Sequence, residues 1–188
     1  MSGQTLNEAA EWIDQAWGLL TRASVDRRSA WRTPALATVE KRAGLPRVRT
    51  VVLRRVDVSA RQLWIHTDRR SNKWRDLAEC GRAELMFWDP KPQRQLRLAC
   101  HIEPCPNGGE AWATMSPAAR RTYGIAPGPG APIPHAKAYY FEQHSAEAQF
   151  GVLLCSALSA DLLELHPDGH RRARQGYEGE GLASWVAP

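Results

Sequence analysis

The chain has 188 residues and a formal net charge of +5, with 43% hydrophobic and 24% charged residues. This length and balance fit one globular domain with an ordinary apolar core, which we expect to span residues 1–188. The sequence lacks an apolar run long enough to cross a membrane, and its first residues include acidic side chains where a secretory signal would be basic and apolar. We therefore expect a cytoplasmic protein that does not bind membranes.

Helices are expected in three places along the chain. Apolar residues recur at helical spacing in the first segment, which predicts an amphipathic helix over about residues 5–22. A second helix is expected to begin after Ser71 as its N-cap and to stop at Gly81. Residues 107–123 also have a helical pattern, broken by a proline, and 124–134 have the composition of a mobile loop.

Strands are expected at 35–41, 47–56, 62–67, 83–88, 95–102, 149–157, 161–165, 171–177 and 183–186.

Many short strands with few helices predict a mainly β protein of the α+β kind, an antiparallel barrel of six strands with peripheral helices. The core barrel is expected over about 35–188, and the helix at 5–22 is expected to pack on it or on a partner chain. The sequence shows no internal repeat and no linker that would divide it into two domains.

Residues 47–57, RVRTVVLRRVD, combine an apolar strand with four arginines. In a strand with a two-residue repeat, Arg47, Arg49 and Arg55 share one face and Arg54 lies on the other. One explanation is an edge strand whose arginines extend along apolar neighbours to reach water. The other is a strand that presents cations to an anionic ligand, and the residue types alone leave both open.

The polypeptide by itself offers little catalytic chemistry. It has no nucleophile elbow, zinc-protease helix, phosphate loop or dinucleotide fingerprint, so the catalytic residues remain unknown, and we predict no metal site. The four cysteines include no CxxC pair and are expected to be reduced, buried thiols.

Cationic and amide side chains stand at the ends of predicted strands, and the helix that begins near Asn72 offers backbone N–H groups to a phosphate. Lys73 and Thr67 would complete that site.

Three motifs, RTVVLR at 49–54, IHTDRRSNKWRDL at 65–77 and AELMFWDPKPQRQLRL at 83–98, resemble in order and spacing the pyridoxamine 5'-phosphate oxidase family of FMN-binding split β-barrels. The resemblance covers about residues 35–103 and returns weakly in QFGVLL and HRRARQGY. It implies an oxidoreductase in which FMN accepts a hydride, and a homodimer with FMN at the interface.

The resemblance implies a role for each matched residue. Arg49 and Lys73 would hold the FMN phosphate, the backbone from Thr50 to Leu53 would lie along the isoalloxazine ring, and Gln95 would hydrogen-bond it. Arg174 loosely matches an arginine donated across the dimer interface. The full set of cofactor-binding residues implied is Arg49, Thr50, Val51, Val52, Leu53, Arg54, His66, Thr67, Ser71, Asn72, Lys73, Gln95 and Arg174.

The sequence departs from the family pattern mainly at the substrate end. Arg54 stands beside flavin and substrate where the family usually has lysine, and Asn72 stands where it usually has arginine. His66 replaces a tyrosine. The tyrosine, arginine and serine that hold the vitamin phosphate have no match in 112–123, and the late arginine and histidine pair is replaced by residues that include Arg172. We expect Arg54 and Arg172 to contact a small anionic substrate.

Two other functions compete with an FMN-dependent oxidoreductase. A non-catalytic flavin-binding module would keep the cofactor residues without an ordered substrate pocket. A nucleic-acid-binding protein would use the positive charge and the eight tryptophans. The arginine pairs are dispersed and form no basic block, so a nucleic-acid partner is the less favoured reading.

Overall fold

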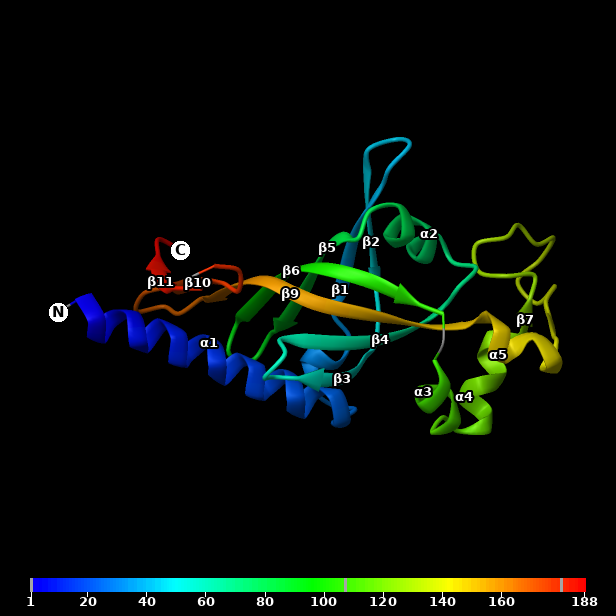
Figure 1. The fold of residues 1–188 in the computed structure, drawn as a ribbon, viewed down its shortest axis with the longest axis horizontal. Helices are drawn as coiled ribbons and strands as arrows, with labels where there is room; N and C mark the ends of the chain where they lie inside the picture. The colour runs from blue at the N-terminus through cyan, green and yellow to red at the C-terminus, as the bar shows by residue number, and fades with distance from the viewer. Residues whose placement is uncertain (1, 107, 180) are drawn as a thin grey trace.

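The computed structural model describes residues 2–106, 108–179 and 181–188. One sheet of nine strands organises this part of the chain, in the order β11, β10, β9, β6, β5, β1, β2, with β4 pairing β9 and β3 pairing β4 off this path (Figure 1). The strands are β1 (Ala35–Glu40), β2 (Leu45–Thr50), β3 (Leu53–Asp57), β4 (Gln62–Asp68), β5 (Arg82–Asp89), β6 (Arg94–Cys105), β9 (Phe150–Glu164), β10 (Arg171–Gly176) and β11 (Ala183–Val186). All of the pairings are antiparallel.

The mainly β, antiparallel class with peripheral helices is therefore confirmed, whereas the predicted count of six strands is not. Strand pairing leaves the nine-stranded sheet unclosed, because β2 is the last strand on its path and β3 pairs only with β4. The segments 149–157 and 161–165 form one strand, β9. Its first half pairs with β4 and its second half with β10, while β6 runs beside it almost throughout.

The segment predicted as a single strand at 47–56 is two strands. β2 ends at Thr50, β3 begins at Leu53, and the amide of the intervening Val51 donates to the carbonyl of Pro34 at 3.0 Å. The register between β3 and β4 then shifts between Leu53 and Arg55, which is a β-bulge. The prediction that Arg54 and Arg55 lie on opposite faces is consequently wrong, since the bulge breaks the two-residue repeat and both side chains line the same cavity.

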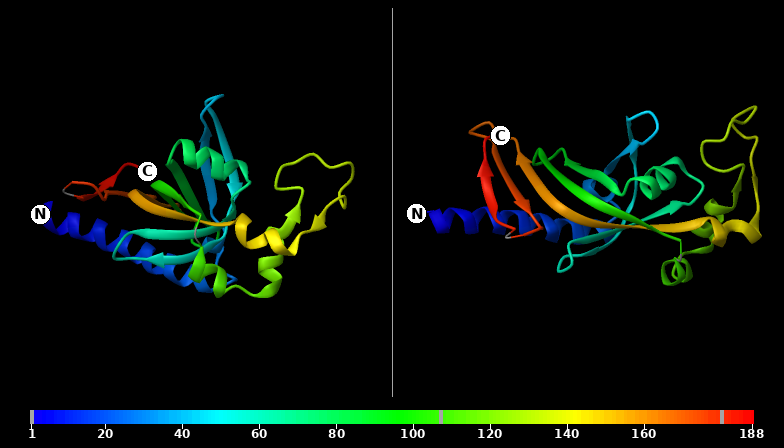
Figure 2. Two further views of the ribbon diagram at one scale, coloured as in Figure 1. Left: turned by 45° about the vertical axis from the view of Figure 1, so that its right-hand side comes forward. Right: turned by 45° about the horizontal axis from the view of Figure 1, so that its top comes forward.

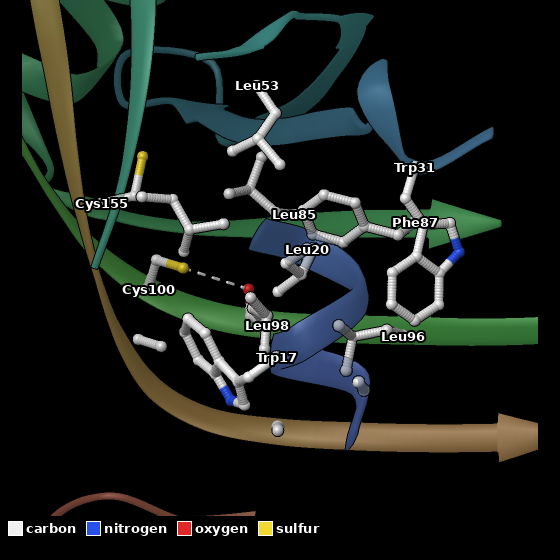
Figure 3. Close-up of a cluster of buried hydrophobic side chains, with 14 of the residues drawn as sticks. Trp17, Leu20, Trp31, Leu53, Leu85, Phe87, Leu96, Leu98, Cys100 and Cys155 are labelled. Carbon is white, nitrogen blue, oxygen red and sulfur yellow. Dashed lines mark hydrogen bonds between the residues drawn. The ribbon is translucent and has the colours of Figure 1, made fainter. Parts of the chain in front are cut away.

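Helix α1 (Ser2–Val25) covers one side of the sheet and is longer than the predicted 5–22 (Figure 1). Its repeating apolar side chains, among them Ile13, Trp17 and Leu20, are fully buried against the sheet. Figure 3 shows Trp17 and Leu20 among side chains of β5 and β6, including Phe87 and Leu98. Burial of one such side chain contributes about 1.5 to 3 kcal/mol, so this face secures α1 to the domain.

The chain between β6 and β9 forms a separate lobe at the end of the sheet remote from the N-terminus (Figure 2). The predicted helical stretch divides at Pro117, because Ser116 caps a new helix by accepting from the amide of Ala119 at 3.3 Å. The predicted loop begins as a short strand that pairs antiparallel with another. The elements of this lobe are α3 (Gly109–Ala113), α4 (Pro117–Arg121), η2 (Thr122–Gly124), β7 (Ile125–Ala126), β8 (Tyr140–Phe141), η3 (Gln143–Ser145) and α5 (Ala146–Gln149).

Two smaller elements complete the fold, η1 (Ala30–Arg32) before β1 and α2 (Asn72–Glu79) after β4. Ser71 is the N-cap residue of α2 as predicted, although its hydroxyl donates to the Asp68 carbonyl at 2.6 Å and accepts no hydrogen bond from the helix backbone. All four cysteines are free thiols, and Cys100 and Cys155 are buried. Among the helices of the described ranges, none combines the length and apolar character that a membrane crossing requires.

Candidate functional site

Four predicted cofactor residues come together where β2, β4 and the start of α2 meet. We call Arg49, Thr67, Ser71 and Lys73 the Arg49–Lys73 cluster. The Lys73 ammonium donates to the Ser71 hydroxyl at 3.2 Å, and the hydroxyls of Thr67 and Ser71 are 3.5 Å apart. Thr67 and Ser71 are buried. Two hydroxyls and two cations from three elements thus converge at one place, although they are as many as 24 positions apart in sequence (73 − 49).

Arg49 is held in position by two residues that the sequence analysis missed. Its guanidinium donates to the Thr38 hydroxyl at 2.6 Å and to the Asp76 carboxylate at 3.4 Å. The Thr38 hydroxyl in turn donates to the same carboxylate oxygen at 2.8 Å, and both Thr38 and Asp76 are buried. The sequence pattern could have pointed to both residues. Thr38 is a polar residue on the inward face of its strand, where Leu36 also lies, and Asp76 lies three positions after Lys73 on α2, so the two share one face of that helix.

The electrostatics of the Arg49–Lys73 cluster favour an added anion. Burial lowers the pKa of Lys73, and the nearby charge of Arg49 lowers it further while Asp68 opposes the change. Burial also lowers the pKa of Arg49, against the opposing effect of Asp76. Lys73 forms no ion pair among the described residues, and Asp68 is bound by the Arg70 guanidinium. A phosphate would relieve the repulsion and accept from the Thr67 hydroxyl, while the Ser71 hydroxyl, which donates to the Asp68 carbonyl, accepts from Lys73, so these residues fit the phosphate of FMN.

Arg54 and His66 lie in a different place from the Arg49–Lys73 cluster. His66 and Thr67 are neighbours on β4 and therefore point to opposite faces, Thr67 toward Ser71 and His66 toward a cavity of about 870 Å³. Arg54 and Arg55 of β3 line the same cavity, and the Arg55 guanidinium stacks over the Trp64 ring at 4.7 Å. Of the predicted cofactor residues, His66 and Thr67 are thus adjacent in sequence but lie on opposite faces of β4.

His66 is neutral near pH 7. Burial, followed by the positive charge of Arg54, lowers its pKa from 6.5 to about 4. Its ring packs edge-on against Phe150 at 5.1 Å between centroids. His66 therefore adds a hydrogen-bonding group but no positive charge to the cavity.

Gln95, Arg172 and Arg174 lie on the outward face of the sheet. Gln95 and Arg172 flank Leu163 of β9 in register, and Arg174 lies opposite Asp161. β10 is separated from β2 by five strand spacings, or about 24 Å along the sheet at 4.8 Å each. In one chain, Arg174 is therefore remote from the Arg49–Lys73 cluster, and Arg172 does not line the cavity that contains Arg54.

Both late arginines are paired with a carboxylate. Arg172 and Arg174 each donate to Asp161 at 2.8 Å, and Arg97 donates to it at 2.6 Å. Burial by itself raises the pKa of Asp161, but these hydrogen bonds hold it well below its usual range. Glu164 pairs in the same way with Arg94 and Arg171.

The remaining predicted residues have defined surroundings. Asn72 is exposed and accepts from the Arg75 guanidinium. Thr50 is exposed at the end of β2, while Val51 and Leu53 are buried and Val52 is half-buried. Since the Val51 amide already donates to Pro34, that N–H group is not free to meet a ligand.

An antiparallel β domain with a half-buried cationic cluster suited to a phosphate indicates a protein that binds a phosphate-bearing cofactor, and comparison with known sequences gives the family. The family model described as "Pyridoxamine 5'-phosphate oxidase, FMN-binding domain" matches residues 10–104. The chain is 38% identical over 88 residues to the pyridoxine/pyridoxamine 5'-phosphate oxidase of Anaeromyxobacter dehalogenans (strain 2CP-C). This match spans 47% of the chain and only 43% of that relative.

Solved structures agree with this family. A pyridoxamine 5'-phosphate oxidase-related, FMN binding protein of Nostoc punctiforme PCC 73102 is 25% identical, with a TM-score of 0.74 over 93% of this chain and 96% of that one. PhzG of Burkholderia lata 383, solved with tetrahydrophenazine-1-carboxylic acid, shares the fold at 18% identity, with a TM-score of 0.73 over 94% of this chain and 92% of its own. The chain belongs to the pyridoxamine 5'-phosphate oxidase FMN-binding family, and its cofactor is FMN.

Proposed function

We propose that this protein is an FMN-dependent oxidoreductase that acts as a homodimer on a small anionic substrate. The observation that carries the proposal is the arrangement around β4. A cationic cluster suited to the FMN phosphate lies on one face of this strand, and a large cavity lined by Arg54 lies on the other. The FMN phosphate and the substrate would thus be held on opposite sides of one rigid strand, and the flavin ring must extend from its phosphate to the substrate for hydride transfer.

Within this proposal Arg49 and Lys73 bind the FMN phosphate, with Thr67 as a hydroxyl donor, Ser71 orienting Lys73 and Asp76 orienting Arg49. The chain from Thr50 to Leu53 then carries the cofactor toward Arg54. FMN supplies the hydride-accepting chemistry, and the protein binds and orients it.

The substrate is proposed to differ from the vitamin phosphates. Arg120 of α4 is turned away from the cavity, since it donates to the carbonyls of Trp112 and Ala113 at 3.0 and 2.6 Å. Arg121 packs over the Phe141 ring at 4.1 Å. With these arginines engaged elsewhere, we expect pyridoxamine and pyridoxine 5'-phosphate to be oxidised slowly or not at all.

The homodimer is supported by the outward face of the sheet. This face carries Gln95 and Arg174, which would reach a flavin held by the Arg49 of a second chain. It also exposes apolar side chains, with Val48 66%, Val39 45% and Trp88 39% exposed. Apolar side chains exposed on one face of a sheet favour association. Light scattering at micromolar concentration tests the dimer, and a monomer with tightly bound flavin would contradict it.

The test of activity begins with the colour and mass of the bound cofactor. We expect flavin absorbance near about 450 nm and release of FMN, followed by anaerobic reduction of the flavin by an electron donor found in a screen. Catalytic efficiency on either vitamin phosphate at or above about 10⁴ M⁻¹s⁻¹ would contradict the proposed substrate difference.

The competing functions predict other outcomes. A protein that binds FMN but whose flavin no donor reduces would be a non-catalytic flavin-binding module. A colourless protein that binds nucleic acid with a steep salt dependence would contradict both flavin readings. A cytoplasmic location remains a prediction, and the four free cysteines suit a reducing compartment.

A further inference from the structure

The cavity beside His66 contains arginines from two separate parts of the chain. β3 contributes Arg54 and Arg55, and the connection between α1 and β1 contributes Arg27 and Arg32. The end of α1 lies beside β3, and α3 lies across from them (Figure 1). The resemblance to the family gives no role to the α1–β1 connection, so this second source of positive charge belongs to the chain's own structure.

Arg32 is held firmly at the edge of this cavity. Its guanidinium donates to the carbonyls of Ala23, at 3.3 Å, and Ser24, both in the last turn of α1. Unpaired carbonyls at a helix C-terminus carry partial negative charge and attract such a cation. One Nη atom makes these bonds, which fixes the plane of the guanidinium beside the cavity.

The positive charges of the cavity oppose one another. Burial lowers the pKa of Arg32, and the charges of Arg54 and Arg27 lower it further, with Asp26 opposing. None of the cavity's four arginines forms an ion pair among the described residues. His66 adds no charge, so the wall formed by β3 and the α1–β1 connection is cationic; Asp26 and Asp57 of these segments do not line the cavity and form no ion pair with its arginines.

The opposite wall of the cavity is different. It is formed by α3, α4 and adjacent residues, which line it with small and neutral side chains such as Ala111, Thr114, Ser116 and Ala119. Its single charged residue is Glu110. An anionic ligand would therefore place its charges along the arginine wall, and the volume of about 870 Å³ leaves room for more than one oxyanion group.

We propose that the cavity binds a ligand with two separated oxyanion groups, one held by Arg54 and the other by Arg32 with Arg27, and that Arg32 determines this specificity. The inference rests on the proposed function, because it names the class of substrate. Carboxylates and phosphates share the required chemistry, since a planar guanidinium binds either one through paired hydrogen bonds.

The experiment measures binding to the FMN-loaded protein by calorimetry at fixed ionic strength. The probes are benzene-1,3-dicarboxylate against benzoate, and pyrophosphate against inorganic phosphate. In one of the pairs, we expect the probe with two oxyanion groups to bind about 10-fold or more tightly than the probe with one group, because it makes one extra charge-assisted contact. The pair with the larger ratio identifies carboxylate or phosphate as the preferred group. Ratios near one for both pairs would overturn the proposal.

Variants separate the two anchors. Arg32→Ala should reduce the preferred ratio to near one while benzoate or phosphate binding changes little, whereas Arg54→Ala should weaken both members of the pair. Arg28→Ala is the matched control, because Arg28 is an exposed neighbour that does not line the cavity. A ratio that persists in Arg32→Ala would overturn the assignment of Arg32.

Arg32 also supports the end of α1, so two further variants protect the test against misfolding. Arg32→Lys should keep the fold and lower the ratio, and Arg27→Ala should lower it by about 3-fold without touching the helix. Turnover is not needed for these measurements. A flavin that no donor reduces would contradict the proposed function but leave the ratios measurable, while ratios of one in an active enzyme would contradict only this inference.

Discussion

Arginines occupy two regions of this molecule in opposite circumstances. On β6, β9 and β10, two carboxylates pair with five arginines: Asp161 with Arg97, Arg172 and Arg174 on the outward face, and Glu164 with Arg94 and Arg171 on the face that α1 covers. The four arginines of the cavity beside His66 form no ion pair among the described residues. The number of arginines is therefore a poor guide to a binding site. What the carboxylates leave unsatisfied is the better guide: the arginines around Asp161 and Glu164 are largely engaged, whereas those of the cavity keep their charge for a ligand.

The largest effect is expected from Asp161→Asn. Removing this charge weakens the hydrogen bonds of three arginines whose side chains are 22% to 55% exposed, and at about 1 kcal/mol for each contact the loss is about 3 kcal/mol of unfolding free energy. Urea unfolding measures the change. The control is Glu40→Gln, which removes an exposed pair with Arg47 and should change stability by less than about 0.5 kcal/mol. Wild-type stability in Asp161→Asn would mean that Arg172 and Arg174 are free to bind a ligand.

Arg49→Ala tests the cluster that we assign to the FMN phosphate. The variant should bind FMN about 30 to 150 times more weakly, because a charge-assisted contact worth about 2 to 3 kcal/mol is lost. Fluorescence titration measures the affinity. Arg47→Ala is the control, since Arg47 lies two positions earlier and is already paired with Glu40. Equal affinities in the two variants would exclude this phosphate site.

His66 tests the unbalanced charge of the cavity through pH. Its folded pKa of about 4 lies below the ordinary value of 6.5, so the folded protein resists protonation. The unfolding free energy is therefore highest above pH 6.5 and decreases as pH falls toward 4, and the loss reaches about 2 kcal/mol at pH 5.

His66→Phe should therefore flatten the fall in stability between pH 6.5 and 4, as followed by urea unfolding at several pH values. A doubly anionic ligand in the cavity should raise the pKa of His66, because it compensates Arg54. A pKa that does not change with bound ligand, measured by NMR, would place the anion elsewhere.

The smallest effect is expected from Asp76→Asn. Asp76 orients Arg49 without contacting FMN in our proposal, so its loss should weaken FMN binding about 5-fold, or about 1 kcal/mol. Glu79→Gln, an exposed change on the same helix, is the control. An effect as large as that of Arg49→Ala would mean that Asp76 does more than position the guanidinium.

Local patterns along the chain determined much of the fold. Helical spacing predicted α1 because the residues that repeat there, such as Ile13 and Trp17, are the ones buried against the sheet. Most of the strands follow from the same logic. Thr67, Ser71 and Lys73 could also be grouped in advance, since they lie within one short strand-to-helix turn.

Tertiary structure decided which charged residues are partnered. Asp161 meets Arg97 across β6 and Arg174 across β10, and these registers depend on long-range strand pairing that no local pattern encodes. The bulge that turns Arg54 and Arg55 to one cavity is likewise invisible to a two-residue repeat. Arg32 reaches the same cavity only because α1 packs beside β3. The sequence alone determined the elements and the family, while the roles of its arginines depended on which elements came to lie side by side.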